Sequence, residues 1–175
     1  NKKEAPIILT GFNRRFSKYM QHIKKEVSKR SNPMIINYRM NAGYQPLSLW
    51  YHQEEGGGRN LGEACHIYDI FTFLTDAKIE KTEAYSITPT TEHYSSRDNF
   101  TALLKFSDGS VATLTYSALG NSKYPKELME VYVDGKVIKL EDYKGMHIIM
   151  KNTKRITSKF AEKGHFEELD AFATA

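Results

Sequence analysis

The chain has 175 residues, of which 40% are hydrophobic and 26% are charged, and its formal net charge is +4. This length fits one domain with a hydrophobic core of its own. The sequence contains no run of roughly 18 apolar residues and no signal-peptide pattern, so it predicts no membrane span. A single cysteine, Cys65, excludes a disulfide framework and favours a reducing compartment, the cytoplasm. The mild positive charge suits a small anionic ligand but is too weak to indicate nucleic-acid binding.

The first part of the chain predicts a strand, a helix, a second strand and a long loop. Residues 6–10 form a short apolar run that is typical of a strand, and Ser17 can cap a helix that extends to residue 29. A proline-containing turn ends this helix, and residues 34–40 alternate as a strand. The irregular loop over residues 41–58 has a length that is usually functional or mobile. The expected buried stripe of the helix is Met20, Ile23 and Val27.

Strands dominate the second part of the chain. Asp108-Gly109 and Asp134-Gly135 are hairpin signals between alternating segments. Hairpins in series imply an antiparallel or mixed sheet, and the helices must cover one of its faces. The sequence therefore predicts an α+β fold. The expected strands are residues 78–86, 99–106, 111–117, 127–133, 136–141, 147–151 and 155–159, and a helix is expected over residues 165–174.

The most informative stretch covers residues 56–69 and begins with three glycines. Because glycine lacks a Cβ, this backbone can turn sharply and approach a ligand closely. A helix is expected over residues 60–74, with Asn60 as its cap. The start of this helix would therefore face whatever the glycine loop surrounds.

A single histidine, His66, lies on this expected helix between two carboxylates. Glu63 precedes it by three residues and Asp69 follows it by three, so each lies about one helical turn away. An imidazole beside a carboxylate is suited to proton transfer. The alternative is a histidine packed on a core helix with both nitrogens satisfied, and the spacing alone leaves the two interpretations open.

The only tryptophan of the chain, Trp50, lies in the long loop before the glycines. Its aromatic face can stack on a sugar or a base. Its alternative role is to anchor the loop by filling a gap in the core, and the sequence does not decide between the two.

Three apparent cofactor or metal motifs fail on inspection. The run Gly-Gly-Gly-Arg-Asn-Leu at residues 56–61 lacks the last glycine of a dinucleotide fingerprint and follows no strand. Glu63-x-x-His66 has the spacing of a di-iron helix, but the second such pair is missing. Cys65 and His66 lack two further ligands for zinc. The sequence therefore predicts no metal site and no cofactor-binding residues within this chain.

Three segments together carry a family resemblance. They are Gly-Phe-Asn-Arg-Arg-Phe-Ser at 11–17, Asn-Tyr-Arg-Met-Asn-Ala-Gly-Tyr at 37–44 and Gly-Gly-Gly-Arg-Asn-Leu-Gly-Glu-Ala-Cys-His-Ile-Tyr-Asp at 56–69. In order and spacing the chain resembles the C-terminal domain of the Gfo/Idh/MocA family of NAD(P)-dependent oxidoreductases. It is most similar to members encoded with surface-polysaccharide pathways, which act on sugars or nucleotide-sugars.

This resemblance implies an open, mostly antiparallel mixed sheet with helices packed on one face. It makes residues 1–175 a single C-terminal domain for substrate binding and oligomerisation. The family's N-terminal Rossmann domain, which mainly binds the NAD or NADP, is absent from this chain. The chain opens without methionine and stops inside a helical pattern, as expected of a piece of something longer. By itself it is expected to be inactive and not to bind NAD.

The resemblance also assigns roles to single residues. His66 matches the histidine that takes or gives the substrate hydroxyl proton, and Arg39 and Asn41 match positions that often contact substrate. Many relatives have an aspartate where this chain has Gly62. Either Glu63 supplies that carboxylate, or the site has drifted from plain alcohol oxidation. By proximity in sequence, the other expected substrate contacts are Arg15, Tyr44, Trp50 and Arg59.

For Arg14 and Arg15 an ion pair on the sheet or helix surface is an equal alternative. The expected partners of the chain are a sugar or nucleotide-sugar substrate, the Rossmann domain of the same polypeptide, and a second copy that packs on the sheet face. Two other functions remain open at this point, a non-catalytic oligomerisation module and a module that binds a small anion.

Overall fold

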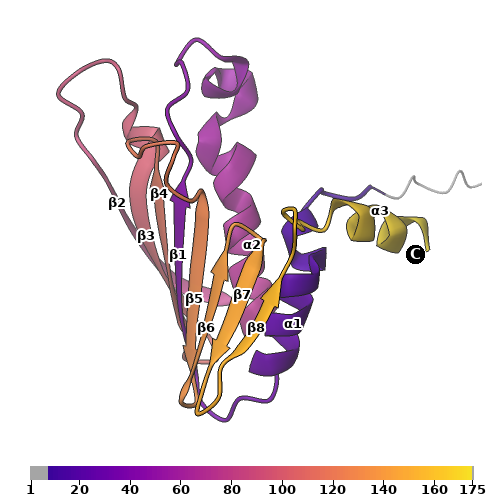
Figure 1. The fold of residues 1–175 in the computed structure, drawn as a ribbon. Coiled ribbons are helices and arrows are strands. Elements are labelled where there is room, and N and C mark those ends of the chain that lie inside the picture. Colours follow the sequence, from indigo (N-terminus) through magenta and orange to yellow (C-terminus); the bar gives the residue numbers. More distant parts are fainter. Residues whose placement is uncertain (1–7, 175) are drawn as a thin grey trace, which may run out of the picture.

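The computed structural model describes residues 8–174 as one mixed sheet of eight strands with helices on one of its faces (Figure 1). The order of the strands is β2-β3-β4-β1-β5-β6-β7-β8. The predicted α+β fold, with an open and mostly antiparallel mixed sheet, is confirmed. The strands are β1 (Ile35–Asn41), β2 (Ile79–Ser86), β3 (Asn99–Phe106), β4 (Val111–Ser117), β5 (Glu127–Val133), β6 (Lys136–Glu141), β7 (Gly145–Ile149) and β8 (Lys154–Thr157).

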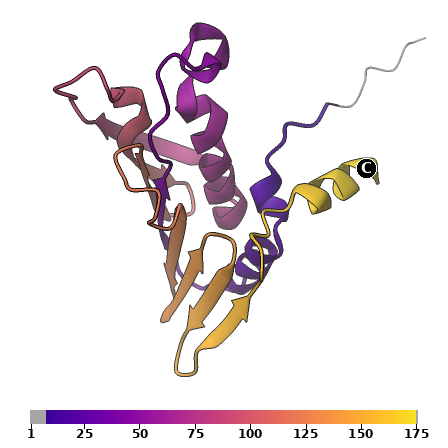
Figure 2. The ribbon, with the colours of Figure 1, turned by 45° about the horizontal axis from the view of Figure 1, so that its top comes forward.

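The helical segments fall into long helices and single turns. The helices are α1 (Lys18–Val27), α2 (Cys65–Thr75) and α3 (His165–Ala173). The 3₁₀ turns are η1 (Asn13–Phe16), η2 (Trp50–His52), η3 (Glu54–Gly56) and η5 (Ser96–Asp98), and η4 (Asn60–Ala64) is a π-helical turn. Figures 1 and 2 show α1 and α2 against the sheet, whereas α3 extends away from it beside the start of the described chain.

The central strand, β1, organises the sheet. It pairs in parallel with β4 and antiparallel with β5, so that Tyr38 lies between Leu114 and Met129. The other neighbours are antiparallel pairs. The turn between β5 and β6 has positive φ at both Asp134 (43°) and Gly135 (74°), as a two-residue hairpin turn requires.

The core lies between the sheet and the first two helices. Alternate residues of β1, Ile36, Tyr38 and Met40, are buried toward the helices. The predicted stripe of α1, Met20, Ile23 and Val27, is also buried. Ser17 accepts a hydrogen bond from the backbone N–H of Met20, which confirms the predicted cap, and the helix ends at Val27 rather than at residue 29.

Three local predictions are wrong. Residues 8–10 form no strand and lie outside the eight-stranded sheet; residues 6 and 7 lie outside the described range. Strands β7 and β8 lie one or two residues before their expected positions, because Asp142 and Tyr143 turn the chain with positive φ. Asn60 does not cap a helix, since its side chain accepts from the Tyr68 hydroxyl at 3.0 Å.

Candidate functional site

A loop and a π-helical turn connect β1 to α2 at one end of the sheet. Gly57 and Gly58 have φ values of +67° and +78°, which non-glycine residues rarely adopt, and these angles turn the loop into η4. The π-helical turn then shifts the register at the start of α2, a feature often found at functional sites. Ala64 and Ile67 are buried in the core. Gly62, Glu63 and His66 face the end of the sheet rather than the core.

These three residues form one wall of a cavity of about 410 Å³. The other walls come from the long loop, from η1 and from the residue before β5, so segments far apart in sequence meet here. The volume lies in the range of small-molecule sites. The cavity is lined by Arg14, Ala42, Gln45, Trp50, Tyr51, Gly56, Gly58, Arg59, Gly62, Glu63, His66 and Lys126.

His66 is half-buried in this wall, with its ring edge-on to Phe12 at 5.7 Å. Its Nδ1 is buried and has no hydrogen-bond partner among residues 8–174, which leaves Nε2 as the nitrogen toward the cavity. Burial and the nearby charge of Arg14 lower the pKa of His66, and the charges of Asp69, Glu127 and Glu63 only partly oppose this. The imidazole is therefore neutral at pH 7 and can accept a proton. Asp69 itself is held by the guanidinium of Arg15.

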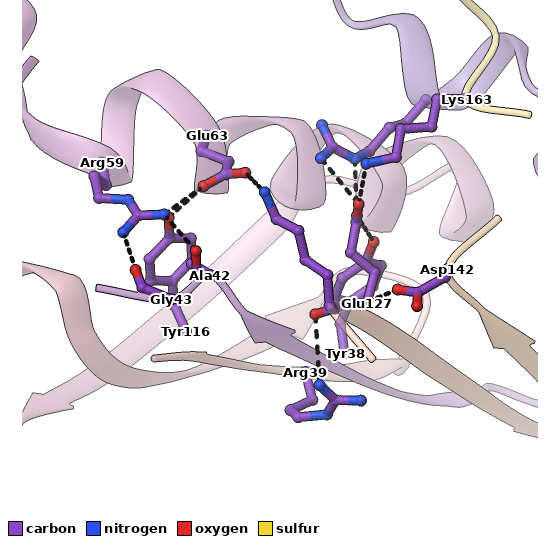
Figure 3. Close-up of polar contacts among 12 residues, drawn as sticks. Tyr38, Arg39, Ala42, Gly43, Arg59, Glu63, Tyr116, Glu127, Asp142 and Lys163 are labelled. Carbon is purple, nitrogen blue, oxygen red and sulfur yellow. Dashed lines mark hydrogen bonds and ion pairs between the residues drawn. The ribbon is translucent and has the colours of Figure 1, made fainter. Parts of the chain in front are cut away.

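Glu63 is bound by three donors (Figure 3). Its carboxylate accepts from Arg59 Nη2 at 3.1 Å, from Lys126 Nζ at 2.6 Å and from the Tyr116 hydroxyl. Burial acts to raise its pKa, but the hydrogen bonds from Lys126 and Tyr116 and the charges of Lys126 and Arg59 lower the pKa to about 2. Glu63 therefore stays ionised, and it holds cations at the cavity wall rather than exchanging protons.

A second carboxylate, Glu127, is buried behind the cavity at the start of β5 (Figure 3). It accepts from Arg14 Nε at 3.0 Å, from Lys163 Nζ at 2.6 Å and from the Tyr38 hydroxyl at 2.5 Å. Burial acts to raise the pKa of Glu127, but these two cations lower it overall. The carboxylate thus joins η1, β1, β5 and the segment before α3.

Four of the eight predicted site residues line the cavity: His66, Glu63, Trp50 and Arg59. Trp50 is 70% exposed there. Arg59 is buried, and its guanidinium donates to the carbonyls of Ala42 and Gly43 as well as to Glu63. Arg59 therefore shapes the loop and has little donor capacity left for a ligand.

The other four predicted residues lie elsewhere: Arg15, Arg39, Asn41 and Tyr44. Arg15 is bound to Asp69 on α2. Arg39 donates to the Pro125 carbonyl. Asn41 donates to the carbonyls of residues 121 and 124, and Tyr44 stacks on His93 with ring centroids 4.0 Å apart. In this structure all four are bound to other parts of the protein.

Sequence reasoning missed Arg14, Gln45, Tyr51 and Lys126. Of these two neighbours in sequence, Arg15 is the one predicted to contact substrate, but η1 directs Arg14 into the cavity and Arg15 toward α2. Lys126 reaches the cavity because β5 begins beside the end of β1, where the Asn41 amide donates to the Lys126 carbonyl at 2.7 Å. No pattern in the sequence predicts that β5 pairs with β1.

The first glycine of the run packs closely against its own loop. A Cβ on Gly56 would lie 2.2 Å from Tyr51 Cα. Across residues 8–174 no group of three or more His, Cys, Asp or Glu side chains could hold a metal ion. No helix in this range is long and apolar enough to cross a membrane.

The domain thus combines an open mixed sheet, helices on one face of the sheet and a cavity where α2 begins. The family model of the GFO/IDH/MocA C-terminal domain matches residues 32–139, and the chain belongs to this family. No curated protein matches the chain in sequence.

Solved structures with this fold include enzymes and a repressor. A UDP-N-acetylglucosamine 3-dehydrogenase from Acidithiobacillus ferrooxidans is 18% identical with a TM-score of 0.71, over 96% of this chain and 53% of that one. A levoglucosan dehydrogenase in complex with NADH and levoglucosan is 15% identical with a TM-score of 0.69, over 87% and 47%. A super-repressor mutant of Gal80p from Saccharomyces cerevisiae is 13% identical with a TM-score of 0.71, over 94% and 50%. The chain thus spans about half the length of each.

We predict that Glu127→Gln strongly destabilises the fold, because it leaves the buried Arg14 and the partly buried Lys163 without their shared counter-charge. The expected loss is about 3 kcal/mol or more of unfolding free energy, measured by urea denaturation followed by circular dichroism. Glu130→Gln on the same strand is the control; its side chain accepts only from the half-exposed Tyr132, and the expected change is within about 0.5 kcal/mol. Equal losses in the two variants would contradict the prediction.

We predict that Glu63 makes the fold sensitive to acid. Its pKa is about 2 in the folded chain against an ordinary value of 4.5, so its stabilisation is complete above pH 5 and is lost as the pH falls toward 2. The shift corresponds to about 3 kcal/mol. Denaturation at pH 6, 4 and 3 should show the stability difference between wild type and Glu63→Gln narrowing with acid. A difference that stays constant with pH would refute this role.

Proposed function

We propose that this chain is the C-terminal domain of an NAD(P)-dependent oxidoreductase that acts on a sugar or nucleotide-sugar in the cytoplasm. In this proposal His66 exchanges the proton of a substrate hydroxyl, and an N-terminal Rossmann domain of the same polypeptide binds the cofactor. The observation that carries it is a half-buried imidazole with a lowered pKa at a cavity in a domain of this family. The names of two structural neighbours, dehydrogenases of a nucleotide-sugar and of a sugar derivative, support the substrate class.

The proton transfer follows from the position of the ring. As a carbinol carbon becomes a carbonyl, its hydroxyl must lose a proton, and Nε2 of His66 is free to accept it. The nicotinamide supplies the chemistry of hydride acceptance when it is bound. A general base in such a position contributes about 10²–10⁴-fold. Burial and the charge of Arg14 disfavour the His66 imidazolium. When the reaction runs as a reduction, they therefore favour transfer of the proton from His66 to the substrate oxygen.

The walls of the cavity suit a polar ligand with apolar faces. Trp50 offers an exposed aromatic surface on which a sugar ring can stack, and Gln45 and Tyr51 offer groups for hydroxyls. A Cβ on Gly62 would meet nothing within 4 Å, so the missing side chain leaves room next to His66. Glu63 does not replace a carboxylate beside the imidazole in this proposal, because its oxygens already bind Arg59, Lys126 and Tyr116.

A non-catalytic module is the second candidate function. Gly62 lacks the aspartate that many relatives of the family have at this place, and one structural neighbour is a repressor. In such a module the cavity would bind a ligand without turnover. The test of His66 described next separates the two candidates.

We predict that His66→Asn, in the polypeptide that joins this chain to a Rossmann domain, lowers kcat by about 10²–10⁴-fold. The physical reason is loss of the proton acceptor, while the shape of the wall and the KM change little. Steady-state oxidation of UDP-N-acetylglucosamine and of levoglucosan, followed as NADH absorbance, is the measurement. His22→Asn on the exposed side of α1 is the control and should retain full activity. Unchanged turnover by His66→Asn would leave only the non-catalytic module.

We also propose that the open face of the sheet packs against a second copy of the chain. The face away from the helices carries exposed apolar side chains: Ile35 (53%), Leu103 (43%), Tyr132 (41%) and Ile149 (41%). Apolar groups gathered on one exposed face mark an interaction surface. A symmetric pair would place the same face on both sides of the contact.

We predict that Leu103→Glu converts the oligomer to a monomer, because a carboxylate buried in an apolar interface lacks a counter-charge. Sedimentation velocity at several protein concentrations measures this. Leu169→Glu is the matched control, since Leu169 is 64% exposed on α3, away from the sheet face. A wild-type chain that sediments only as a monomer would rule out the interface.

A further inference from the structure

The cavity wall has an excess of cations. Three of its lining residues, Arg14, Arg59 and Lys126, are positively charged, while Glu63 is the one carboxylate among them and His66 is neutral at pH 7. Three of the carboxylates behind the wall already have partners. Glu127 is shared by Arg14 and Lys163, Asp142 accepts from the Glu127 backbone, and Asp69 binds Arg15. Asp98 lies 3.6 Å from His52, and its Oδ1 is buried without a hydrogen-bond partner among residues 8–174.

The three cations of the cavity wall differ in the hydrogen-bond donors that they have free for a ligand. Arg59 uses both terminal nitrogens on Ala42, Gly43 and Glu63. Arg14 uses Nε and Nη2 on Glu127, and its Nη1 donates no hydrogen bond to any residue from 8 to 174, although the side chain is only 7% exposed. This nitrogen is not among the buried polar atoms of residues 8–174 that lack a partner, so it is accessible at the cavity and can donate to a ligand.

Lys126 is the second cation with free donors. Its Nζ donates to Glu63 at 2.6 Å, which uses one of three N–H groups, and the side chain is 44% exposed. Its neighbour in sequence, Glu127, holds Arg14 of η1, so one short segment at the start of β5 both carries Lys126 and positions Arg14. The ion pairs fix both cations in place before a ligand arrives.

We infer that an anionic group of the substrate, a carboxylate or a phosphate, binds between Arg14 and Lys126 next to His66. This inference rests on the proposed function and adds to it the charge of the substrate and the place where that charge binds. Arg14 provides its free nitrogen and Lys126 its free ammonium hydrogens, and an anion there forms charge-assisted hydrogen bonds with both.

A bound anion changes the electrostatics of His66 in a measurable way. The charge of Arg14 is one of the two causes that lower the pKa of this imidazole. An anion beside Arg14 offsets that charge, so the pKa of His66 rises toward its ordinary value. The NMR titration of the His66 ring therefore reports binding without any turnover.

The test uses the 175-residue chain, which carries its own hydrophobic core. Inorganic phosphate, glucuronate and uncharged glucose are added separately at constant ionic strength, because salt screens charge pairs. We expect phosphate or glucuronate to shift the His66 resonances saturably and to raise the pKa of His66, and glucose to do neither. Lys126→Gln should weaken this binding about tenfold. Lys123→Gln, three residues away and outside the cavity, should not weaken it.

Each result has a defined meaning. A response to phosphate alone supports a phosphoryl group of the substrate, a response to glucuronate alone supports a sugar carboxylate, and a response to both supports a site for either anion. Absence of a saturable response to both anions, equal binding of glucose, or unchanged binding by Lys126→Gln would overturn the inference. Anion binding with unchanged turnover by His66→Asn would instead reject the proposed function and keep the anion site.

Discussion

The structure depends on one buried carboxylate. Glu127 is 2% exposed and receives hydrogen bonds from Arg14, Lys163 and Tyr38. A carboxylate at such a depth stays ionised only if its oxygens are paired, so the elements that carry these donors must assemble together. The donors come from η1, from β1 and from the segment before α3, three parts of the chain that pair with β5 or cover it. The same carboxylate therefore links these three parts of the chain and holds Arg14 at the cavity.

The order of the strands explains why this carboxylate lies where it does. β5 runs antiparallel to β1, and Met40 pairs with Glu127, so β5 begins at the end of the sheet where β1 stops. The loop that leaves β1 then passes over the same end and returns as α2. Lys126 and Glu127 on one side and Glu63 and His66 on the other are thus brought together by a pairing between strands about 90 residues apart in sequence.

The sequence predicted the parts of the fold that local rules govern. Bounds of the strands from β3 to β6 follow from alternation of side chains and from turn residues at Asp108 and Asp134, which are properties of neighbouring residues. The position of β1 between β4 and β5 depends on residues far apart in sequence, and no periodic pattern in the sequence predicts it. The same limit applies to the site: His66, Glu63, Trp50 and Arg59 lie in the segment that the glycines mark, whereas Lys126 reaches the cavity only through strand order.

Glu63 and Glu127 both lie near His66, and their ion pairs affect the protonation of this imidazole. Glu63 and Glu127 each bind two cations, and their negative charges only partly offset the effects that lower the pKa of His66. The pKa of His66 is lowered by burial and by Arg14, which Glu127 holds in place. A carboxylate hydrogen-bonded to Nδ1 would instead stabilise the charged ring and raise that pKa. With Gly62 lacking a side chain and Asp69 held by Arg15, the ring stays neutral and is poised to receive a proton rather than to hold one.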